Sequence, residues 1–169
     1  MIPLMPDPIT MVPRYYLGPH FYIFIPTWFV SIGLMIYIVS SLKENASPNL
    51  LGFSIFFSLL FLYYYFKTGF SAPGIASSNI IPDFSMRSNQ RYCVPCRIIR
   101  PRGTQHCYYC DVCIAGMDHH CPWVGKCIGK DNICLFYKFL VACGCMMTSL
   151  LITAVTATPN NPPQQNMKP

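Results

Sequence analysis

Charged side chains are scarce in this chain of 169 residues: Asp, Glu, Lys and Arg make up 11%, whereas hydrophobic residues make up 53%. Soluble domains usually carry about 25% charged residues, so the apolar residues exceed what a water-soluble core needs. A buried helical core in a soluble protein is the alternative interpretation. It is disfavoured because the polar, Cys-rich segment between the apolar runs could not shield them from water.

The sequence also lacks the marks of nucleic-acid-binding and secreted proteins. Its net charge is +6, yet no recognition helix or base-stacking platform accompanies that charge, so no nucleic-acid partner is expected. The first twenty residues are Pro-rich and lack a basic region followed at once by an apolar one, so no secretory signal peptide is expected. Eight of the twelve Lys and Arg residues lie between Lys67 and Lys130. Basic loops between membrane spans face the cytosol, where they meet anionic headgroups.

Three long apolar runs predict transmembrane helices at residues 21–42, 50–66 and 135–157. The first would form a helix about 33 Å long, enough to cross a hydrocarbon core of about 30 Å. The predicted organisation continues with a cytosolic N-terminal segment (1–20) and a cytosolic loop (67–134). The tail 158–169 is rich in Pro, Asn and Gln and is expected to be disordered on the opposite side of the membrane.

Cysteine is abundant, and eight of the ten cysteines fall between Cys93 and Cys134, interleaved with histidines. In a secreted chain this would indicate a disulfide framework, but cytosolic disulfides are uncommon. Two C-x2-C pairs with further Cys and His nearby favour zinc, which takes four such ligands in a tetrahedron. The ten candidate ligands are Cys93, Cys96, His106, Cys107, Cys110, Cys113, His119, His120, Cys121 and Cys127.

Two structural zinc ions would use eight of these ten residues. His106 and Cys107 are adjacent, and neighbouring side chains usually diverge, so the two would tend to bind different metals. One set consistent with this is Cys93, Cys96, His106 and Cys113, and the other is Cys107, Cys110, His120 and Cys127. Spacing alone leaves this assignment open. A zinc module that only holds a shape for a partner remains an alternative, but it does not explain the two residues left over.

Those two residues are His119 and Cys121, and Asp118 precedes them. A thiolate is the nucleophilic form of cysteine, and a nearby imidazole can take the thiol proton. A carboxylate can orient that imidazole, as in other catalytic triads. The short distance to the third apolar run would keep Cys121 at the membrane surface. A nucleophilic cysteine at a lipid interface suggests acyl transfer through a thioester.

The segment from Asp118 to Val124 reads Asp-His-His-Cys-Pro-Trp-Val, and Cys127-Ile128-Gly129, Asn132 and Phe136 follow it. Together with the upstream cysteine spacing, it resembles the signature of the DHHC-type protein S-acyltransferases, or palmitoyltransferases. The resemblance is close over residues 92–136 and loose over the flanking spans. It implies an α-helical integral membrane protein with a small zinc-bound, cysteine-rich cytosolic domain between spans 2 and 3.

By this resemblance, Cys121 accepts a fatty acyl group from acyl-CoA, becomes palmitoylated, and passes the group to a cysteine of a protein substrate near the membrane. His119 is the base, Asp118 orients it, and His120 is a zinc ligand; the two Cys3His sets also agree with the family. The acyl chain would lie among the transmembrane helices. The expected location is an endomembrane such as the Golgi, the ER or the plasma membrane. Candidates for binding the CoA phosphates are Arg100, Arg102, Lys126 and Lys130.

The sequence departs from the family pattern at several positions. Lys126 stands where many members have Asn, and Ala72-Pro73-Gly74 stands where many have Asp-Pro-Gly. Members usually have a fourth span followed by a Thr-Thr-x-Glu motif, and this chain is expected to lack both. A truncated or inactive, zinc-stabilised membrane adaptor without turnover is therefore the alternative to an active acyltransferase.

Overall fold

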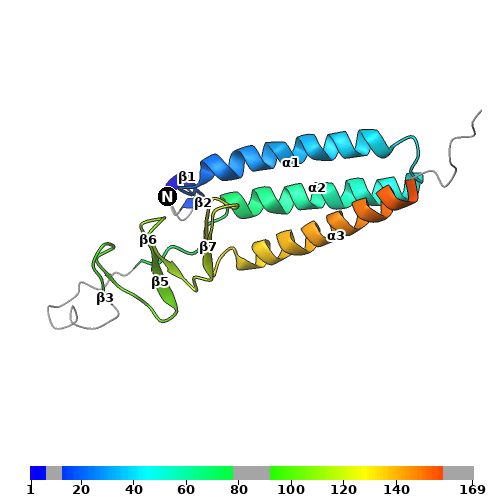
Figure 1. The fold of residues 1–169 in the computed structure, drawn as a ribbon. Coiled ribbons are helices and arrows are strands. Elements are labelled where there is room, and N and C mark those ends of the chain that lie inside the picture. Colours follow the sequence, from blue (N-terminus) through cyan, green and yellow to red (C-terminus); the bar gives the residue numbers. More distant parts are fainter. Residues whose placement is uncertain (7–12, 78–91, 158–169) are drawn as a thin grey trace, which may run out of the picture.

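A computed structural model describes residues 1–6, 13–77 and 92–157, which form three long helices with a strand-rich unit at one end (Figure 1). By length and composition, each helix is long and apolar enough to cross a membrane. The predicted disordered tail, 158–169, lies outside the described residues. The helices are α1 (Phe21–Leu42), α2 (Pro48–Phe70) and α3 (Ile133–Ala157).

Two of the helices are longer than the apolar runs that predicted them. α2 begins two residues before and ends four residues after the run 50–66, and α3 begins two residues before the run 135–157. Pro48 occupies the first turn of α2, where its missing N–H has no cost and its fixed φ suits the helix. At the other end, Thr68 and Gly69 are buried and Gly69 lies against Phe24 of α1, so packing extends the helix beyond the purely apolar residues.

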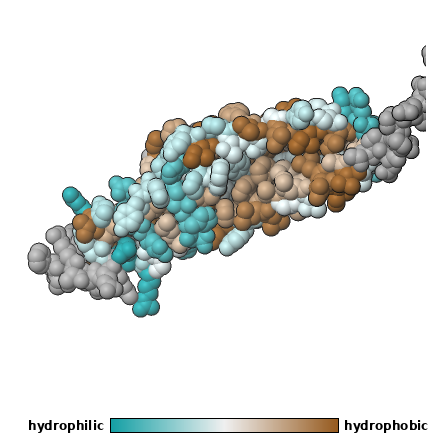
Figure 2. Space-filling model, viewed as in Figure 1, coloured by the Kyte–Doolittle hydropathy of each residue, from teal (hydrophilic) through white to brown (hydrophobic). Residues whose placement is uncertain are grey.

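The outer faces of the helices are apolar. Large side chains such as Phe29, Phe53, Val141 and Leu151 are each more than half exposed. Hydrophobic residues gather along the helices, whereas hydrophilic residues gather over the strand-rich end (Figure 2). Water would penalise so much exposed apolar surface, and lipid would not. This distribution is that of a membrane-embedded bundle and contradicts the alternative of a water-soluble helical core.

Close contacts join the three helices. α2 packs most extensively against α3. Within that contact Ser54 and Thr153 form a buried hydrogen bond of 2.9 Å between their hydroxyl groups. α1 docks on α2 through Phe24, which is 2% exposed and lies over Gly69, where any side chain would overlap the Phe24 ring. The buried aromatic ring and the missing side chain thus fix the position of α1.

The strand-rich unit is built from very short antiparallel hairpins, none of which was predicted from the sequence. A first hairpin, β1 (Ile2–Pro6) with β2 (Pro13–Leu17), lies in the N-terminal segment. The segment after α2 pairs with β6, where Ala115 N donates to Gly74 O at 2.8 Å. The Cys-rich region contains β3 (Tyr92–Cys93) with β4 (Ile98–Ile99), β5 (Thr104–Cys107) with β6 (Val112–Ala115), and β7 (His119–Cys121) with β8 (Lys126–Ile128).

Candidate functional site

The hairpin of β7 and β8 distributes three consecutive residues over two faces. His120 pairs with Cys127, and Cys121 pairs with Lys126. Because successive side chains of a strand point to opposite faces, His119 and Cys121 share one face and His120 occupies the other. His120 accordingly meets cysteines, whereas His119 meets a helix: its ring centroid lies 5.2 Å from that of Phe136 on α3.

On the face that His120 occupies, three sulfurs surround one nitrogen of its ring. Its Nδ1 lies 3.5 Å from Sγ of Cys107, 3.4 Å from Sγ of Cys110 and 3.5 Å from Sγ of Cys127. The sulfurs of Cys110 and Cys127 are 3.4 Å apart. All four ligand atoms lie within 4.8 Å of one another. We call this group the second cluster.

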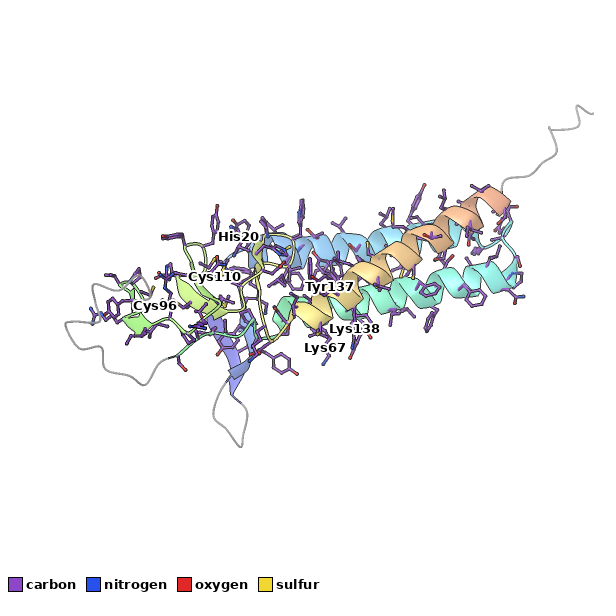
Figure 3. The ribbon with its side chains drawn as sticks, turned by 90° about the horizontal axis from the view of Figure 1, so that it is seen from below. His20, Lys67, Cys96, Cys110, Tyr137 and Lys138 are labelled. Carbon is purple, nitrogen blue, oxygen red and sulfur yellow. The ribbon has the colours of Figure 1, made fainter. Side chains whose placement is uncertain are left out.

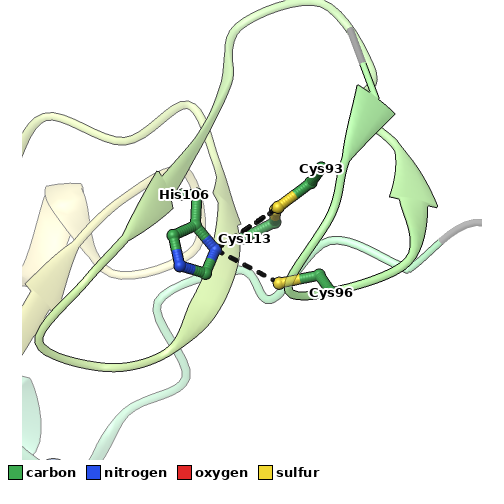
Figure 4. A group of neighbouring side chains, drawn as sticks. All are labelled: Cys93, Cys96, His106 and Cys113. Carbon is green, nitrogen blue, oxygen red and sulfur yellow. Dashed lines mark hydrogen bonds between the residues drawn. The ribbon is translucent and has the colours of Figure 1, made fainter. Parts of the chain in front are cut away.

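The first cluster repeats this arrangement around His106 (Figure 4). Nδ1 of His106 lies 3.5 Å from Sγ of Cys93, 3.2 Å from Sγ of Cys96 and 3.9 Å from Sγ of Cys113. His106 and Cys113 face each other across the β5–β6 ladder. Cys107 follows His106 on the same strand and points away, so the two adjacent residues belong to different clusters, as their adjacency predicted.

Both clusters have the dimensions of a tetrahedral zinc site. With Zn–S near 2.3 Å and Zn–N near 2.0–2.1 Å, the ligand atoms of a Cys3His tetrahedron are about 3.5–3.8 Å apart. The measured N···S distances of 3.2–3.9 Å scatter around that value. The two groups of four residues could therefore each hold a zinc ion, and they are the two sets considered from the sequence.

Each C-x2-C pair turns back through a left-handed residue that follows it. Arg97 has φ 54° and Asp111 has φ 52°, values uncommon for residues with a side chain. Asp111 N donates to Cys107 O at 2.8 Å, which closes the turn. The turn directs both sulfurs of the pair to one point and starts the return strand. Such backbone strain persists where surrounding bonds hold it, as metal ligation would.

The protonation of the second cluster suits metal binding. Burial, with smaller contributions from His20 and His119, lowers the pKa of His120 below its ordinary value, which favours the neutral imidazole. A hydrogen bond from Cys127 lowers the pKa of Cys110 to about 7, and the same contact raises the pKa of Cys127. A zinc ion would replace the shared thiol proton, because metals bind thiolate and neutral imidazole.

The opposite face of β7 carries the predicted catalytic residues. Nδ1 of His119 lies 2.7 Å from Oδ2 of Asp118, so its Nε2 is directed elsewhere and can act as a base. The His119 side chain is 40% exposed. Cys121 is 8% exposed. It belongs to a core that also contains Val124, from the turn between β7 and β8, together with Tyr65 of α2 and Ala142 of α3. The three residues thus sit where the strand-rich unit meets the helices.

One predicted role is wrong. Lys126, a candidate for binding CoA phosphate, is fully buried. Its ammonium group donates hydrogen bonds to the backbone carbonyls of Tyr16 and Ser71, and burial lowers its pKa to about 7. It therefore ties β8 to the N-terminal hairpin and to the end of α2. Arg102 and Lys130 are exposed.

Another residue at the site, His20, was not predicted from the sequence. Nδ1 of His20 lies 2.8 Å from Nε2 of His120. A single histidine in a Pro-rich segment before an apolar run carries no ligand spacing. Only the docking of α1 brings it within reach of a residue 100 positions away.

Comparison with known proteins agrees with this geometry. Residues 86–168 match the family model described as DHHC palmitoyltransferase. The chain is 47% identical to palmitoyltransferase ZDHHC18-B of Danio rerio over 66 residues, which is 39% of this chain and 17% of that protein. It is 41% identical to palmitoyltransferase ZDHHC18 of Homo sapiens over 66 residues, again 39% of this chain and 17% of that protein. It is 50% identical to palmitoyltransferase ZDHHC9 of Bos taurus over 52 residues, which is 31% of this chain and 14% of that protein. The match therefore spans less than a fifth of each relative.

Proposed function

We propose that this chain, whose residues 86–168 match the DHHC palmitoyltransferase family model, is a membrane-bound protein S-acyltransferase that carries a fatty acyl group on Cys121. One observation carries the proposal: the alternation along β7 directs His120 to the second cluster and leaves His119 and Cys121 together on the face toward the helices. Asp118 is bonded to the ring of His119 in the same site.

In the first half-reaction, Nε2 of His119 takes the proton of the Cys121 thiol. The thiolate attacks the carbonyl carbon of acyl-CoA, the C–S bond to CoA breaks, and the CoA thiolate leaves with the proton from His119. Asp118 holds the ring through Nδ1 and stabilises the imidazolium that forms, as a carboxylate does in other triads. The product is a thioester on Cys121.

In the second half-reaction, a cysteine of a protein substrate replaces CoA. His119 takes the proton of the incoming thiol, the new thiolate attacks the acyl-Cys121 carbonyl, and Cys121 leaves as a thiol after proton return. The net reaction moves one acyl group from CoA to a protein cysteine. Aromatic side chains next to Cys121 would receive the acyl chain: the ring of Tyr65 stacks on that of Phe139 at 5.1 Å and on that of Phe61 at 5.7 Å.

Two structural zinc ions would hold the strand-rich unit together, one in each cluster. Zinc supplies folding free energy in units too small to build an apolar core. The chain's own residues then keep β7 and β8 in register, which keeps His119 beside Cys121. Neither ion takes part in the chemistry.

The strand-rich unit would face the cytosol from an endomembrane such as the Golgi, the ER or the plasma membrane. Lys67, Tyr137 and Lys138 lie at the end of the helices nearest that unit (Figure 3). Basic and aromatic residues at one end of a bundle mark the cytosolic interface. Protein cysteines close to the membrane would reach Cys121 there.

Acyl-enzyme formation tests the proposal. The purified chain in nanodiscs is incubated with labelled palmitoyl-CoA, and hydroxylamine-sensitive label is compared between wild type and Cys121→Ser. Zinc content is measured in both, so that loss of folding is not mistaken for loss of the nucleophile. Label that requires Cys121 supports the proposal. Zinc-loaded wild type without label would refute it and favour the non-catalytic adaptor.

A further inference from the structure

An imidazole that belongs to neither cluster contacts one that does. Nδ1 of His20 lies 2.8 Å from Nε2 of His120. We propose that His20 is an outer-sphere residue of the second cluster, which holds His120 in its ligating orientation and couples metal binding there to the docking of helix α1. The inference rests on metal binding as proposed above, and it does not depend on acyl transfer.

The tautomers follow from which atoms face each other. Nδ1 of His120 faces the three sulfurs, so that nitrogen is the one that would bind metal. A neutral imidazole bound through Nδ1 carries its hydrogen on Nε2, which here points at His20. Nε2–H of His120 therefore donates to Nδ1 of His20, and the hydrogen of His20 sits on its own Nε2. Metal-binding histidines are commonly oriented by such a second hydrogen bond.

The position of His20 is fixed from the backbone. Its N–H donates to Gly125 O at 3.1 Å, within the turn that joins β7 to β8. Its carbonyl accepts from the N–H groups of Ile23 and Phe24, which begins α1. His20 is thus the residue that immediately precedes helix α1, and it is also bonded to the hairpin that bears His120.

Neighbouring residues restrict the His20 ring as well. Its centroid lies 4.9 Å from that of His120 and 5.6 Å from that of Tyr109, both in edge-on arrangements. Two residues earlier, a side chain at Gly18 would overlap the backbone of Gly125 and the side chain of Lys126. The N-terminal segment therefore approaches the hairpin as closely as glycine permits, and the contact between the two imidazoles is not a loose surface contact.

The first cluster provides an internal comparison. There Nε2 of His106 lies 3.7 Å from Oδ1 of Asp111, beyond hydrogen-bond distance, and the Asp111 side chain is 84% exposed. The two clusters have the same ligand types and similar spacing. Among the residues that the structure describes, only the second cluster has a partner within hydrogen-bond distance of the outer nitrogen of its imidazole. Loss of the outer partner should therefore weaken metal binding at the second cluster and leave the first unchanged.

The contact also predicts a coupling in the reverse direction. Metal that fixes His120 favours the docked position of His20, and docked His20 favours the ligating position of His120. Such coupling is reciprocal for binding equilibria. Outer-sphere partners of metal ligands typically change metal affinity by about 10–100-fold, which sets the expected effect of removing the His20 acceptor.

Three variants of the full chain, purified in detergent with zinc bound, test the inference. His20→Phe keeps a ring next to Tyr109 but has no acceptor; His20→Asn places an amide oxygen near the position of Nδ1; Asp111→Asn is the matched control at the first cluster. Zinc is titrated out with a chelator of known affinity. Thiol alkylation, mapped by mass spectrometry, then reports each cluster separately: Cys107, Cys110 and Cys127 against Cys93, Cys96 and Cys113.

We expect the thiols of the second cluster in His20→Phe to become reactive at a free chelator concentration about 10–100-fold lower than in wild type. The thiols of the first cluster should become reactive at the same concentration as in wild type. His20→Asn should restore most of the affinity, and Asp111→Asn should behave as wild type. His20→Phe that behaves as wild type would overturn the inference, as would equal loss of metal from both clusters. If the second cluster of His20→Asn loses zinc as readily as that of His20→Phe, the hydrogen bond accepted by residue 20 does not account for the zinc affinity, and the inference is overturned. Wild type without zinc would refute metal binding itself, a separate failure.

Discussion

The hydroxyl of Tyr65 donates a hydrogen bond of 2.8 Å to the backbone carbonyl of Trp123. Tyr65 lies on α2, and Trp123 lies two residues beyond Cys121. The Trp123 side chain is 65% exposed, so its backbone, and not its indole, is attached to the helix. A side chain of a predicted membrane span thereby fixes the backbone that follows the proposed nucleophile.

Removing this hydrogen bond should slow the first half-reaction. Tyr65→Phe keeps the ring that stacks on Phe139 but frees the Trp123 carbonyl. Such a hydrogen bond contributes about 0.5–1.5 kcal/mol net, and loss of this free energy from the transition state lowers the rate by roughly 2–10-fold. The measurement is the rate of acyl-Cys121 formation at saturating palmitoyl-CoA. Tyr63→Phe, at an exposed position of the same helix, is the control and should have no effect. Equal rates for both variants would contradict the prediction.

Asn132 should be required for the stability of the strand-rich unit. Its buried side chain accepts from Gly129 N at 2.8 Å and donates to Cys127 O at 3.1 Å. Asn132→Ala leaves both backbone groups without these partners, and the expected cost is about 1–3 kcal/mol for each buried group that stays unsatisfied. Thermal unfolding in detergent measures it. Asn132→Asp keeps the acceptor and should fall between wild type and Asn132→Ala. An alanine variant as stable as wild type would show that water replaces the side chain.

Buried Lys126 predicts a pH dependence of stability. Burial lowers its pKa from 10.5 to about 7 in the folded chain. Between these values the unfolded chain binds the proton and the folded chain does not, so stability rises with pH, by at most about 1.4 kcal/mol per pH unit. Below about pH 7 the cost of burying the charge is fully present. The zinc-loaded wild type should therefore gain stability relative to Lys126→Met as pH is raised from 7 to 9. A difference that does not change with pH would contradict this.

Removing zinc should unfold one part of the chain and spare the other. The strands from β3 to β8 have little apolar core beyond the cysteines, Ile114 and Ile128, whereas the helices pack through their own side chains. A strong chelator should therefore make residues 92–132 sensitive to protease, while helical circular dichroism stays nearly unchanged. Addition of zinc should restore protection. Equal resistance with and without chelator would mean that the unit does not depend on metal.

The buried pair of Ser54 and Thr153 offers a test of helix packing. A double-mutant cycle with Ser54→Ala and Thr153→Ala in nanodiscs should give a coupling free energy of about 0.6 kcal/mol, the average for hydrogen bonds between membrane helices, and at most about 1.7 kcal/mol. Ser41 is the control, because its hydroxyl donates to Tyr37 O of its own helix. Coupling between Ser41→Ala and Thr153→Ala should be close to zero. A similar value for both pairs would show that the cycle measures general destabilisation.

The elements that depend on local sequence could be predicted, and those that depend on contacts between distant residues could not. Apolar runs located the three helices because hydropathy is a local property. The adjacency of His106 and Cys107 led to two interleaved groups of four, which the structure brings together. This worked because alternation of side chains along an extended chain does not depend on the rest of the fold.

His20 and Lys126 show where such reasoning fails. The role of His20 arises from docking α1 against a hairpin 100 residues further along the chain. Lys126 is a charged residue on a basic segment, and charge alone suggested an exposed, anion-binding role. Its burial follows from carbonyl groups of β2 and of the end of α2 that converge on it. The short strands were missed because two to five residues are too few to show a period.

The alternation along β7 also makes the length of this segment as important as its composition. Insertion of a single residue between His119 and Cys121 would turn all following side chains of the strand to the opposite face. The thiol would then point toward the second cluster, even though every required residue type was still present. Insertions of one residue should therefore be tolerated in the link between α1 and α2, and should abolish both metal retention and acylation when they fall within these three positions.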